Sequence, residues 1–184
     1  ITPEVYNTCT LTDTIVRLWV EPTLSVDHTV LIDTICDEGL YSNQFTTSSQ
    51  ATRTIYFDVN TYLHKSGVIT GQQTELDFTS DSILNQVLNN HTDTAHKVDY
   101  ILLPFVYEGS LMKCLGPRDT ATVWVEPTPA VHFNRNKDTI CNNSSTTLTL
   151  ESTSSPTRPI RFKYDLNIPA GVQETIAPQF DLAN

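Results

Sequence analysis

The stretch LWVEPT at residues 18–23 recurs, with one conservative change, as VWVEPT at residues 123–128. Trp19 and Trp124 are therefore 105 positions apart (124 − 19). The same offset separates two pairs of cysteines, Cys36 from Cys141 (141 − 36) and Cys9 from Cys114 (114 − 9). A period of this length indicates whole domains repeated in series, because the units of a solenoid are only about 20 to 50 residues long.

The repeat divides the chain into three parts. Residues 1–23 are expected to be the C-terminal strands of a preceding repeat, residues 24–127 one complete repeat, and residues 128–184 the N-terminal part of a following repeat. Neither partial unit has enough residues to bury a core alone, so we expect the sequence to be a window of a longer protein. Pro22 and Pro127 mark the predicted joints between repeats, since proline stiffens a connection and cannot continue a central strand.

Alternating side chains predict an all-β fold. In TATVWVEP at residues 120–127, Ala121, Val123 and Val125 lie on one face of an expected strand, and TIVRLWVEP at residues 14–22 repeats the pattern. Further β-rich runs are VDYILLPFVY (98–107), TIYFDVN (54–60), TTLTLES (146–152) and IRFKYDL (160–166). Short strands in units of about 100 residues predict tandem immunoglobulin-like β-sandwiches. The stretch SDSILNQVLNN at residues 80–90 is compatible with one short helix or with an irregular strand.

Charge and hydropathy bear on two classes of partner, nucleic acids and membranes. The formal net charge is −10 and no run of basic residues is present to neutralise phosphates, so nucleic acid is excluded as a partner. No apolar stretch approaches the roughly 20 residues that span a bilayer, so membrane association is expected only through parts outside this window.

The sequence lacks the motifs of an enzyme. It contains no GxSxG turn and no phosphate-binding glycine loop. His91 and His96 flank a polar loop, and CDEG (36–39) and FDVN (57–60) lack the spaced carboxylates of a calcium loop, so we interpret all of them as turn residues. We predict a protein without catalytic activity, cofactor or bound metal.

The order of these motifs resembles a known family. DTIC, an aliphatic–aromatic strand, an SGV or AGV turn, VDYILLP, a loop cysteine and a closing VWVEPTP are similar to the PKD-like repeats of very large surface proteins of Bacteroidota, including gliding-motility adhesins exported by the type IX pathway. The resemblance implies an extracellular, cell-surface array of β-sandwiches, and it identifies no ligand. Neighbouring repeats of the same chain are the expected partners.

Two functions follow from this interpretation. The first is a stalk segment of a large adhesin that serves surface attachment or gliding. The alternative is a carbohydrate- or protein-binding module whose loops, such as SLMKCLGPRD (110–119) or HKSGVITGQQ (64–73), recognise a surface polysaccharide or protein. Trp19 and Trp124 point away from the aliphatic face of their strands, so each either packs between successive repeats or presents a ring to a ligand.

Six positions follow an Asp in the pattern Asp-Ser/Thr-aliphatic. The pattern is similar to the O-glycan acceptor motif of exported proteins in the same bacterial group, and it is equally explained by Asp side chains that bond to the backbone in turns. The candidate acceptors are Thr14, Thr34, Ser82, Thr94, Thr120 and Thr139.

In a secreted chain, cysteines are expected to form disulfides. The offset makes Cys36 and Cys114 the two cysteines of the complete repeat, and we predict that they pair. Sandwich topology opposes this pairing, because the end of a first strand and the start of a last strand lie near opposite poles, beyond the ~7 Å limit between Cα atoms. The rivals are Cys9–Cys36 with Cys114–Cys141, or free thiols.

Overall fold

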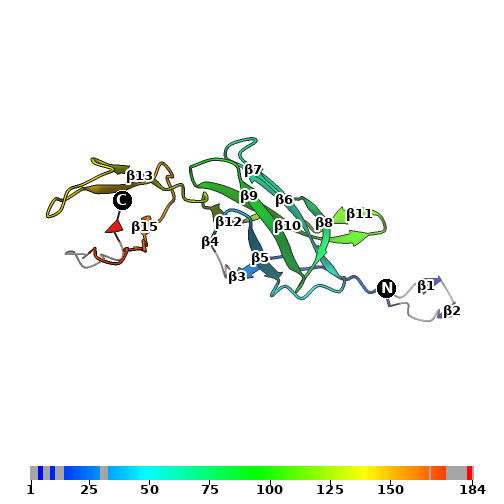
Figure 1. The fold of residues 1–184 in the computed structure, drawn as a ribbon. Helices are drawn as coiled ribbons and strands as arrows, with labels where there is room; N and C mark the ends of the chain where they lie inside the picture. The colour runs from blue at the N-terminus through cyan, green and yellow to red at the C-terminus, as the bar shows by residue number, and fades with distance from the viewer. Residues whose placement is uncertain are drawn as a thin grey trace.

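A computed structural model describes residues 4–5, 9–10, 15–29, 33–165, 167–172 and 182–183. These residues contain sixteen β-strands and no helix, so the predicted all-β class is confirmed. The described part of the chain accordingly has no helix that could cross a membrane. Figure 1 shows a two-sheet body that lies between short strands near the N-terminus and a group of strands near the C-terminus.

The body is a sandwich of two sheets. The first sheet has the order β4 (Thr34–Ile35), β12 (Asp119–Val125), β10 (His96–Glu108), β6 (Ile55–Leu63) and β8 (Glu75–Thr79), and β11 (Leu111–Lys113) also pairs with β10. The second sheet has the order β3 (Asp27–Thr29), β5 (Gly39–Thr46), β9 (Ile83–Asn90) and β7 (Ile69–Thr70). The pairing of β4 with β12 is parallel, and the other pairings in the body are antiparallel.

Strand β10 shows how the sequence pattern places the core. Val98, Tyr100 and Leu102 are fully buried, while Asp99 between them faces outward and bonds to Thr122 on the neighbouring strand. Both edges of β10 are paired, with β6 on one side and β12 on the other. The predicted strand at 98–107 is confirmed, and its central position explains its long apolar run.

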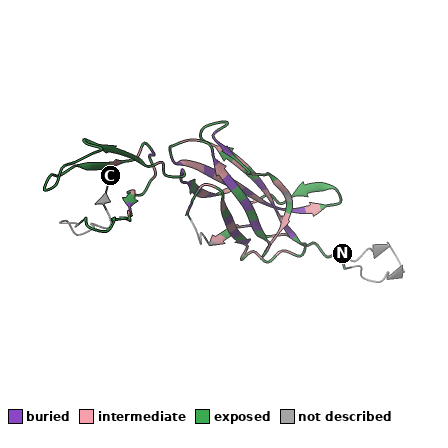
Figure 2. Cartoon of the chain, in the orientation of Figure 1, coloured by how far each residue is buried: buried purple, intermediate pink, exposed green. Residues whose placement is uncertain are grey.

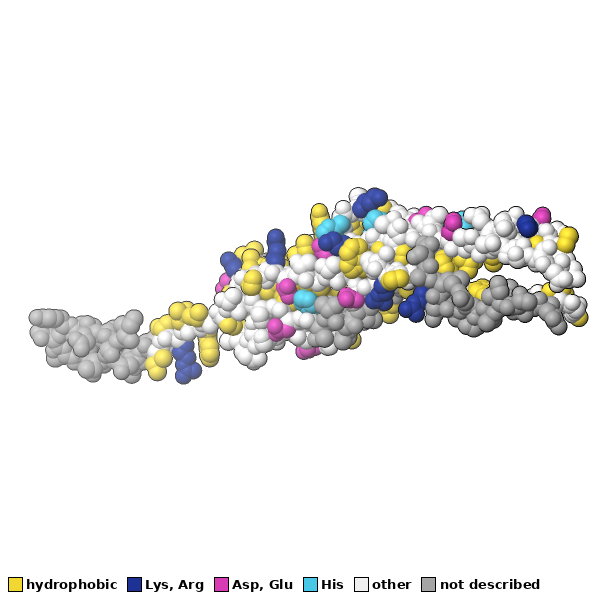
Figure 3. All heavy atoms as spheres, turned by 90° about the vertical axis from the view of Figure 1, so that its left-hand side faces the viewer, with side chains coloured by type: hydrophobic (Ala, Val, Ile, Leu, Met, Phe, Trp, Pro, Cys, Tyr) yellow, Lys and Arg dark blue, Asp and Glu magenta, His cyan; other side chains and the backbone are white. Residues whose placement is uncertain are grey.

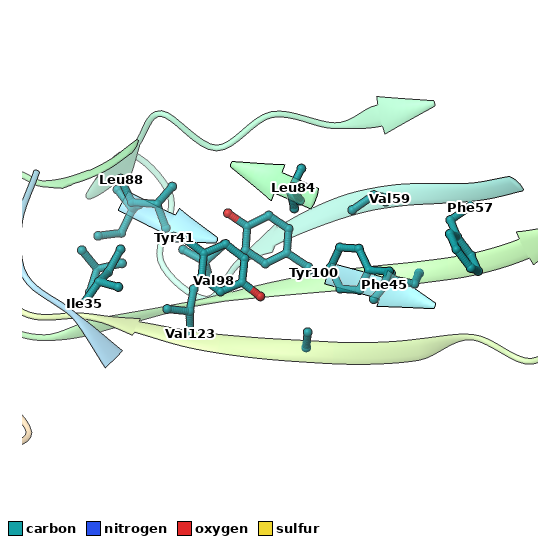
Figure 4. Packing of buried hydrophobic residues seen from close by; sticks show 14 of the residues in the cluster. Ile35, Tyr41, Phe45, Phe57, Val59, Leu84, Leu88, Val98, Tyr100 and Val123 are labelled. Atoms are coloured by element: carbon teal, nitrogen blue, oxygen red, sulfur yellow. The ribbon is translucent and has the colours of Figure 1, made fainter. Parts of the chain in front are cut away.

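Two stacked tyrosines join the sheets across the core. The rings of Tyr41 on β5 and Tyr100 on β10 lie 4.8 Å apart with an interplanar angle of 10° (Figure 4). The Tyr100 hydroxyl donates to Gln86 Oε1 at 2.9 Å, and Asn43 Nδ2 donates to the Tyr41 hydroxyl at 2.9 Å. Burial raises the pKa of both phenols above their ordinary value of 10.0, so they stay neutral and act as hydrogen-bonding groups.

The helical interpretation of residues 80–90 is wrong, because Ile83–Asn90 forms strand β9. Leu84 and Leu88 alternate inward with two buried polar residues, Gln86 and Asn90, and this gives a period of two. Gln86 is paired inside the sandwich with the backbone of Gln73 as well as with Tyr100. A sequence pattern that scores polar residues as exposed hides this strand, because buried amides are permitted once they are fully hydrogen-bonded.

Three short pairs of strands lie outside the body. They are β1 (Glu4–Val5) with β2 (Cys9–Thr10), β13 (His132–Arg135) with β14 (Leu148–Glu151), and β15 (Arg161–Phe162) with β16 (Leu182–Ala183). The register of β13–β14 repeats that of β3–β5 at the offset of 105. Asp27↔Thr46, His28↔Phe45 and Thr29↔Gln44 correspond to His132↔Glu151, Phe133↔Leu150 and Asn134↔Thr149. Strands β13 and β14 are mostly exposed, whereas buried residues gather between the sheets of the body (Figure 2).

The strand predicted at residues 14–22 is wrong over the described residues 15–22, which form no strand. Leu18, Trp19 and Val20 are 86%, 74% and 85% exposed. Hydrophobic side chains accordingly gather on the narrow stretch beside the residues drawn in grey in Figure 3. The equivalent strand β12 is held by partners on both sides, β10 and β4, and no described strand pairs with residues 15–22. The pattern alone cannot form a strand without partners.

Candidate functional site

The site consists of two joints with the same bonding. We define the first joint as residues 21–25 with 47–53, and the second joint as residues 126–130 with 152–158. Each second-joint residue is 105 positions after its first-joint counterpart.

A glutamate closes the first joint. The Glu21 carboxylate accepts a hydrogen bond from the backbone N–H of Thr52 at 2.8 Å and another from the Thr52 hydroxyl. These two bonds hold the pKa of Glu21 below its ordinary value of 4.5, with the hydroxyl bond as the larger cause, because both stabilise the ionised form.

The second joint repeats this arrangement at the same offset. Glu126 accepts from the backbone N–H of Thr157 at 2.9 Å and from the Thr157 hydroxyl. Here the glutamate is 8% exposed, and Pro127 beside it is buried. We refer to the Glu21–Thr52 and Glu126–Thr157 pairs as the clasps.

A serine turn accompanies each clasp. At the first joint the Ser49 hydroxyl accepts from the Ser25 N–H at 2.8 Å and donates to the Thr23 carbonyl at 3.4 Å. At the second joint the Ser154 hydroxyl accepts from the Ala130 N–H at 2.9 Å and donates to the Thr128 carbonyl at 3.4 Å. The clasp and the serine turn together attach the residues on both sides of each proline to the loop 24 to 31 residues further along the chain.

Further bonds tie the second joint to the body. The Ser155 N–H donates to the Asp93 carbonyl at 2.6 Å, and the Ala95 N–H donates to the Ser155 carbonyl at 3.0 Å. The Thr128 hydroxyl donates to Asp37 Oδ2 at 2.9 Å. The pKa of Asp37 is lowered chiefly by the backbone N–H of Asn90, with a smaller contribution from Thr128. The second joint is therefore held at several points.

An arginine follows each clasp threonine. Arg53 donates from Nη1 to the Tyr107 carbonyl at 3.1 Å and lies 4.0 Å from Glu108. Arg158, its counterpart, lies 3.9 Å from Asp33. These ion pairs are largely exposed, so each contributes at most about 1 kcal/mol to its joint.

A cavity opens at each joint. The first has a volume of about 570 Å³ and is lined by Leu18, Trp19, Val20, Glu21, Thr52, Arg53, Glu108, Lys113 and Cys114. The second has a volume of about 500 Å³, and proline, valine and isoleucine side chains line it together with Cys36, Glu126 and Arg158.

The four predicted joint residues lie at or near the two cavities, and they differ in how far they are buried. Trp19 lines the first cavity and Pro22 is exposed. Trp124 lies on β12 opposite Lys97 and Thr34 and is 36% exposed, and Pro127 lines the second cavity. That these residues join two repeats stays a prediction, and sequence reasoning missed the role of the glutamate. The signal available was the repetition of Glu-Pro-Thr followed 31 residues later by Thr-Arg.

The predicted Cys36–Cys114 disulfide is not formed in the structure. Cys36, Cys114 and Cys141 are free and exposed. Cys36 follows β4 and lines the second cavity, whereas Cys114 follows β11 and lines the first, so the two lie at opposite ends of the body (Figure 1). Sandwich topology places the end of a first strand and the start of a last strand at opposite ends of the sandwich, too far apart for a disulfide. The side chain of Cys9 lies outside the described residues.

The candidate glycan acceptors occupy different environments, and their modification stays a prediction. Thr94, Thr120 and Thr139 are exposed, Thr34 and Ser82 are half-buried, and Thr14 lies outside the described residues. Asp33 accepts from the Thr34 hydroxyl at 3.0 Å, and Asp119 accepts from the Thr120 N–H at 2.8 Å. These two bonds are of the kind that the turn interpretation requires.

The histidines of the polar loop are not gathered into a metal site. Thr70 Oγ1 lies 2.8 Å from His91 Nε2, and burial lowers the pKa of His96. Within the described ranges no group of three His, Cys, Asp or Glu side chains is placed to hold a metal ion.

The sequence matches no protein-family model, and neither a curated protein nor a solved structure is similar to the chain.

Acidification should open the first clasp. Because the pKa of Glu21 is lower in the folded chain than in the unfolded chain, its contribution to stability is present above the unfolded value and is lost as pH falls through the folded value. We expect the Thr52 amide resonance to titrate with a midpoint below 4.5, and Glu21→Gln to abolish that titration. A midpoint at or above 4.5 in the NMR titration would show that the clasp does not stabilise the carboxylate.

Proposed function

We propose that the chain is a stalk segment of a large extracellular surface adhesin, built from tandem immunoglobulin-like β-sandwich repeats with a period of about 105 residues. Neighbouring repeats of the same chain are its partners, and the ligand is bound elsewhere in the protein. The cell-surface location, export by the type IX pathway and a role in attachment or gliding rest on the family resemblance of the sequence.

The recurrence of the clasp carries this proposal. Glu21 with Thr52 and Glu126 with Thr157 make the same two bonds at the same offset, at the two places where the repeat predicts a joint. A glutamate at the end of one repeat thereby binds a loop of the next. Such bonding restricts rotation about the proline, which is what a stalk that transmits force requires.

The loops of the body give the alternative function little support. The loops at 64–73 and 110–119 contain no Phe, Tyr or Trp to stack on a sugar ring. The observation in favour of a binding module is on the sheet instead, where Tyr62 and Trp124 are 54% and 36% exposed. The clasp recurs at both joints, and we therefore place the stalk first.

Removing the second clasp should loosen the joint without unfolding the body. Glu126→Ala deletes the acceptor of two hydrogen bonds and leaves the Thr157 N–H without its partner, at a cost of about 2 kcal/mol confined to the joint. We expect ¹⁵N relaxation to give one rotational correlation time for residues 33–165 of the wild-type chain, and two different times for residues 33–125 and 132–165 of the variant.

Two further variants complete this test. Thr157→Val should reproduce the loosening, and Glu151→Ala, which removes an exposed glutamate from β14, should leave the single correlation time unchanged. Equal correlation times for both parts in Glu126→Ala and in Thr157→Val would contradict the role of the clasp.

A further inference from the structure

One free thiol lies at each joint, Cys36 at the second and Cys114 at the first. Cys36 lines the second cavity beside Glu126 and Arg158, and it belongs to the repeat that precedes this joint. Cys114 lines the first cavity beside Glu21 and Arg53, and it belongs to the repeat that follows that joint. Glu21 and Glu126 are equivalent at the offset of 105 (126 − 21), and so are Arg53 and Arg158 (158 − 53). At a joint between two repeats, both cysteines would therefore lie beside the same glutamate and the same arginine, one cysteine from each repeat.

The strand pairing makes this placement more specific. Strand β4 pairs with β12 through Thr34↔Trp124 and Ile35↔Val125, and the Glu126 N–H donates to the Ile35 carbonyl at 2.8 Å. Cys36, the next residue, is thereby held beside Glu126.

At the other joint, Cys114 borders a cavity formed by Leu18, Trp19, Val20 and Glu21, which are equivalent to residues 123–126. Between two complete repeats, both thiols would border one stretch of four residues at the end of the last strand.

We propose that Cys36 of each repeat forms a disulfide with the cysteine at the Cys114 position of the repeat that follows it. The inference rests on the proposed tandem array. It gives all four cysteines one role, since Cys9 is equivalent to Cys114 and Cys141 is equivalent to Cys36. Each of them then pairs across a joint with a cysteine that lies outside this window.

The rival connectivity that joins Cys114 to Cys141 is disfavoured by the same geometry. Cys114 borders the first joint, at the N-terminal end of the body, and Cys141 lies in the repeat that follows the second joint.

The cross-link is a two-electron oxidation. The two S–H bonds break, one S–S bond forms, and two protons and two electrons pass to a disulfide oxidant, which is reduced to two thiols. Oxidised glutathione supplies this oxidant in the test. Because both thiols are exposed, the oxidant can reach them.

The test inserts one further period, so that one complete joint is present. A chain of residues 1–127 followed by residues 23–184 contains six cysteines, the four of the sequence plus a second Cys36 and a second Cys114. After oxidation by a glutathione redox buffer, we expect alkylatable thiols to fall from six to four. Non-reducing peptide mapping should find first-copy Cys36 joined to second-copy Cys114.

Matched variants separate this pairing from others. Cys36→Ser in the first copy removes one cysteine and should prevent the disulfide, so all five remaining thiols should be alkylatable. Cys36→Ser in the second copy should leave the disulfide in place. A disulfide within one copy, or a folded inserted period with six free thiols after oxidation, would overturn the cross-link alone. An inserted period that remains unfolded by hydrogen exchange would overturn the tandem array and the cross-link together.

Discussion

Replacing Phe57 with alanine should lower the free energy of unfolding of the body by about 3 to 5 kcal/mol. Phe57 lies on β6 with its side chain fully buried between the sheets, and it pairs across the sheet with Pro104 and Phe78. Truncation removes the transfer free energy of the ring and leaves a cavity that the surrounding side chains fill only in part. Urea denaturation followed by circular dichroism measures the loss.

A position on the same strand provides the control for Phe57. Asn60 is exposed, and Asn60→Ala should change the free energy of unfolding by no more than about 0.5 kcal/mol. A loss below about 1 kcal/mol for Phe57→Ala would show that β6 does not face the core described here.

The second large effect is expected at Asn90, where a buried amide closes one end of the sandwich. Its Nδ2 donates to the carbonyls of Thr94 at 2.8 Å and Val125 at 2.9 Å, and its Oδ1 accepts from the N–H and hydroxyl of Thr92. Asn90→Ala leaves the buried Val125 carbonyl without this donor, so we expect a loss of about 3 kcal/mol by the same denaturation experiment.

The exposed Asn85 on the same strand provides the comparison for Asn90. Asn85→Ala should cost less than about 0.5 kcal/mol. Equal losses for the two asparagines would mean that the amide network of Asn90 contributes nothing beyond the intrinsic preference of the strand.

The parts of the fold that sequence reasoning predicted are those where apolar residues alternate without interruption. Val123 and Val125 were expected on the core face of their strand and are fully buried, while Trp124 between them faces outward. The same reasoning left β9 undecided between a helix and a strand, because Gln86 and Asn90 occupy core positions with their hydrogen bonds satisfied inside the sandwich. Periodicity cannot identify a buried amide before its partners are known.

The joints show a second limit of prediction from the sequence. The sequence repeat predicted their positions. The bond between Glu126 and Thr157, 31 residues away, could not be predicted, because a glutamate at the end of an alternating pattern gives no indication of such a partner. The Cys36–Cys114 prediction was wrong for a related reason. The shared offset did not indicate where the two cysteines lie in the body, and they lie at its opposite ends.

The most direct test of the tandem array is single-molecule force extension of the chain with one inserted period, in which all cysteines are replaced by serine. We expect two equal unfolding events. Each should release the length of one period of 105 residues, about 350 Å at roughly 3.4 Å per residue, less the folded length of a repeat. A single event that releases both periods at once, or events of unequal length, would contradict a series of equivalent β-sandwich repeats.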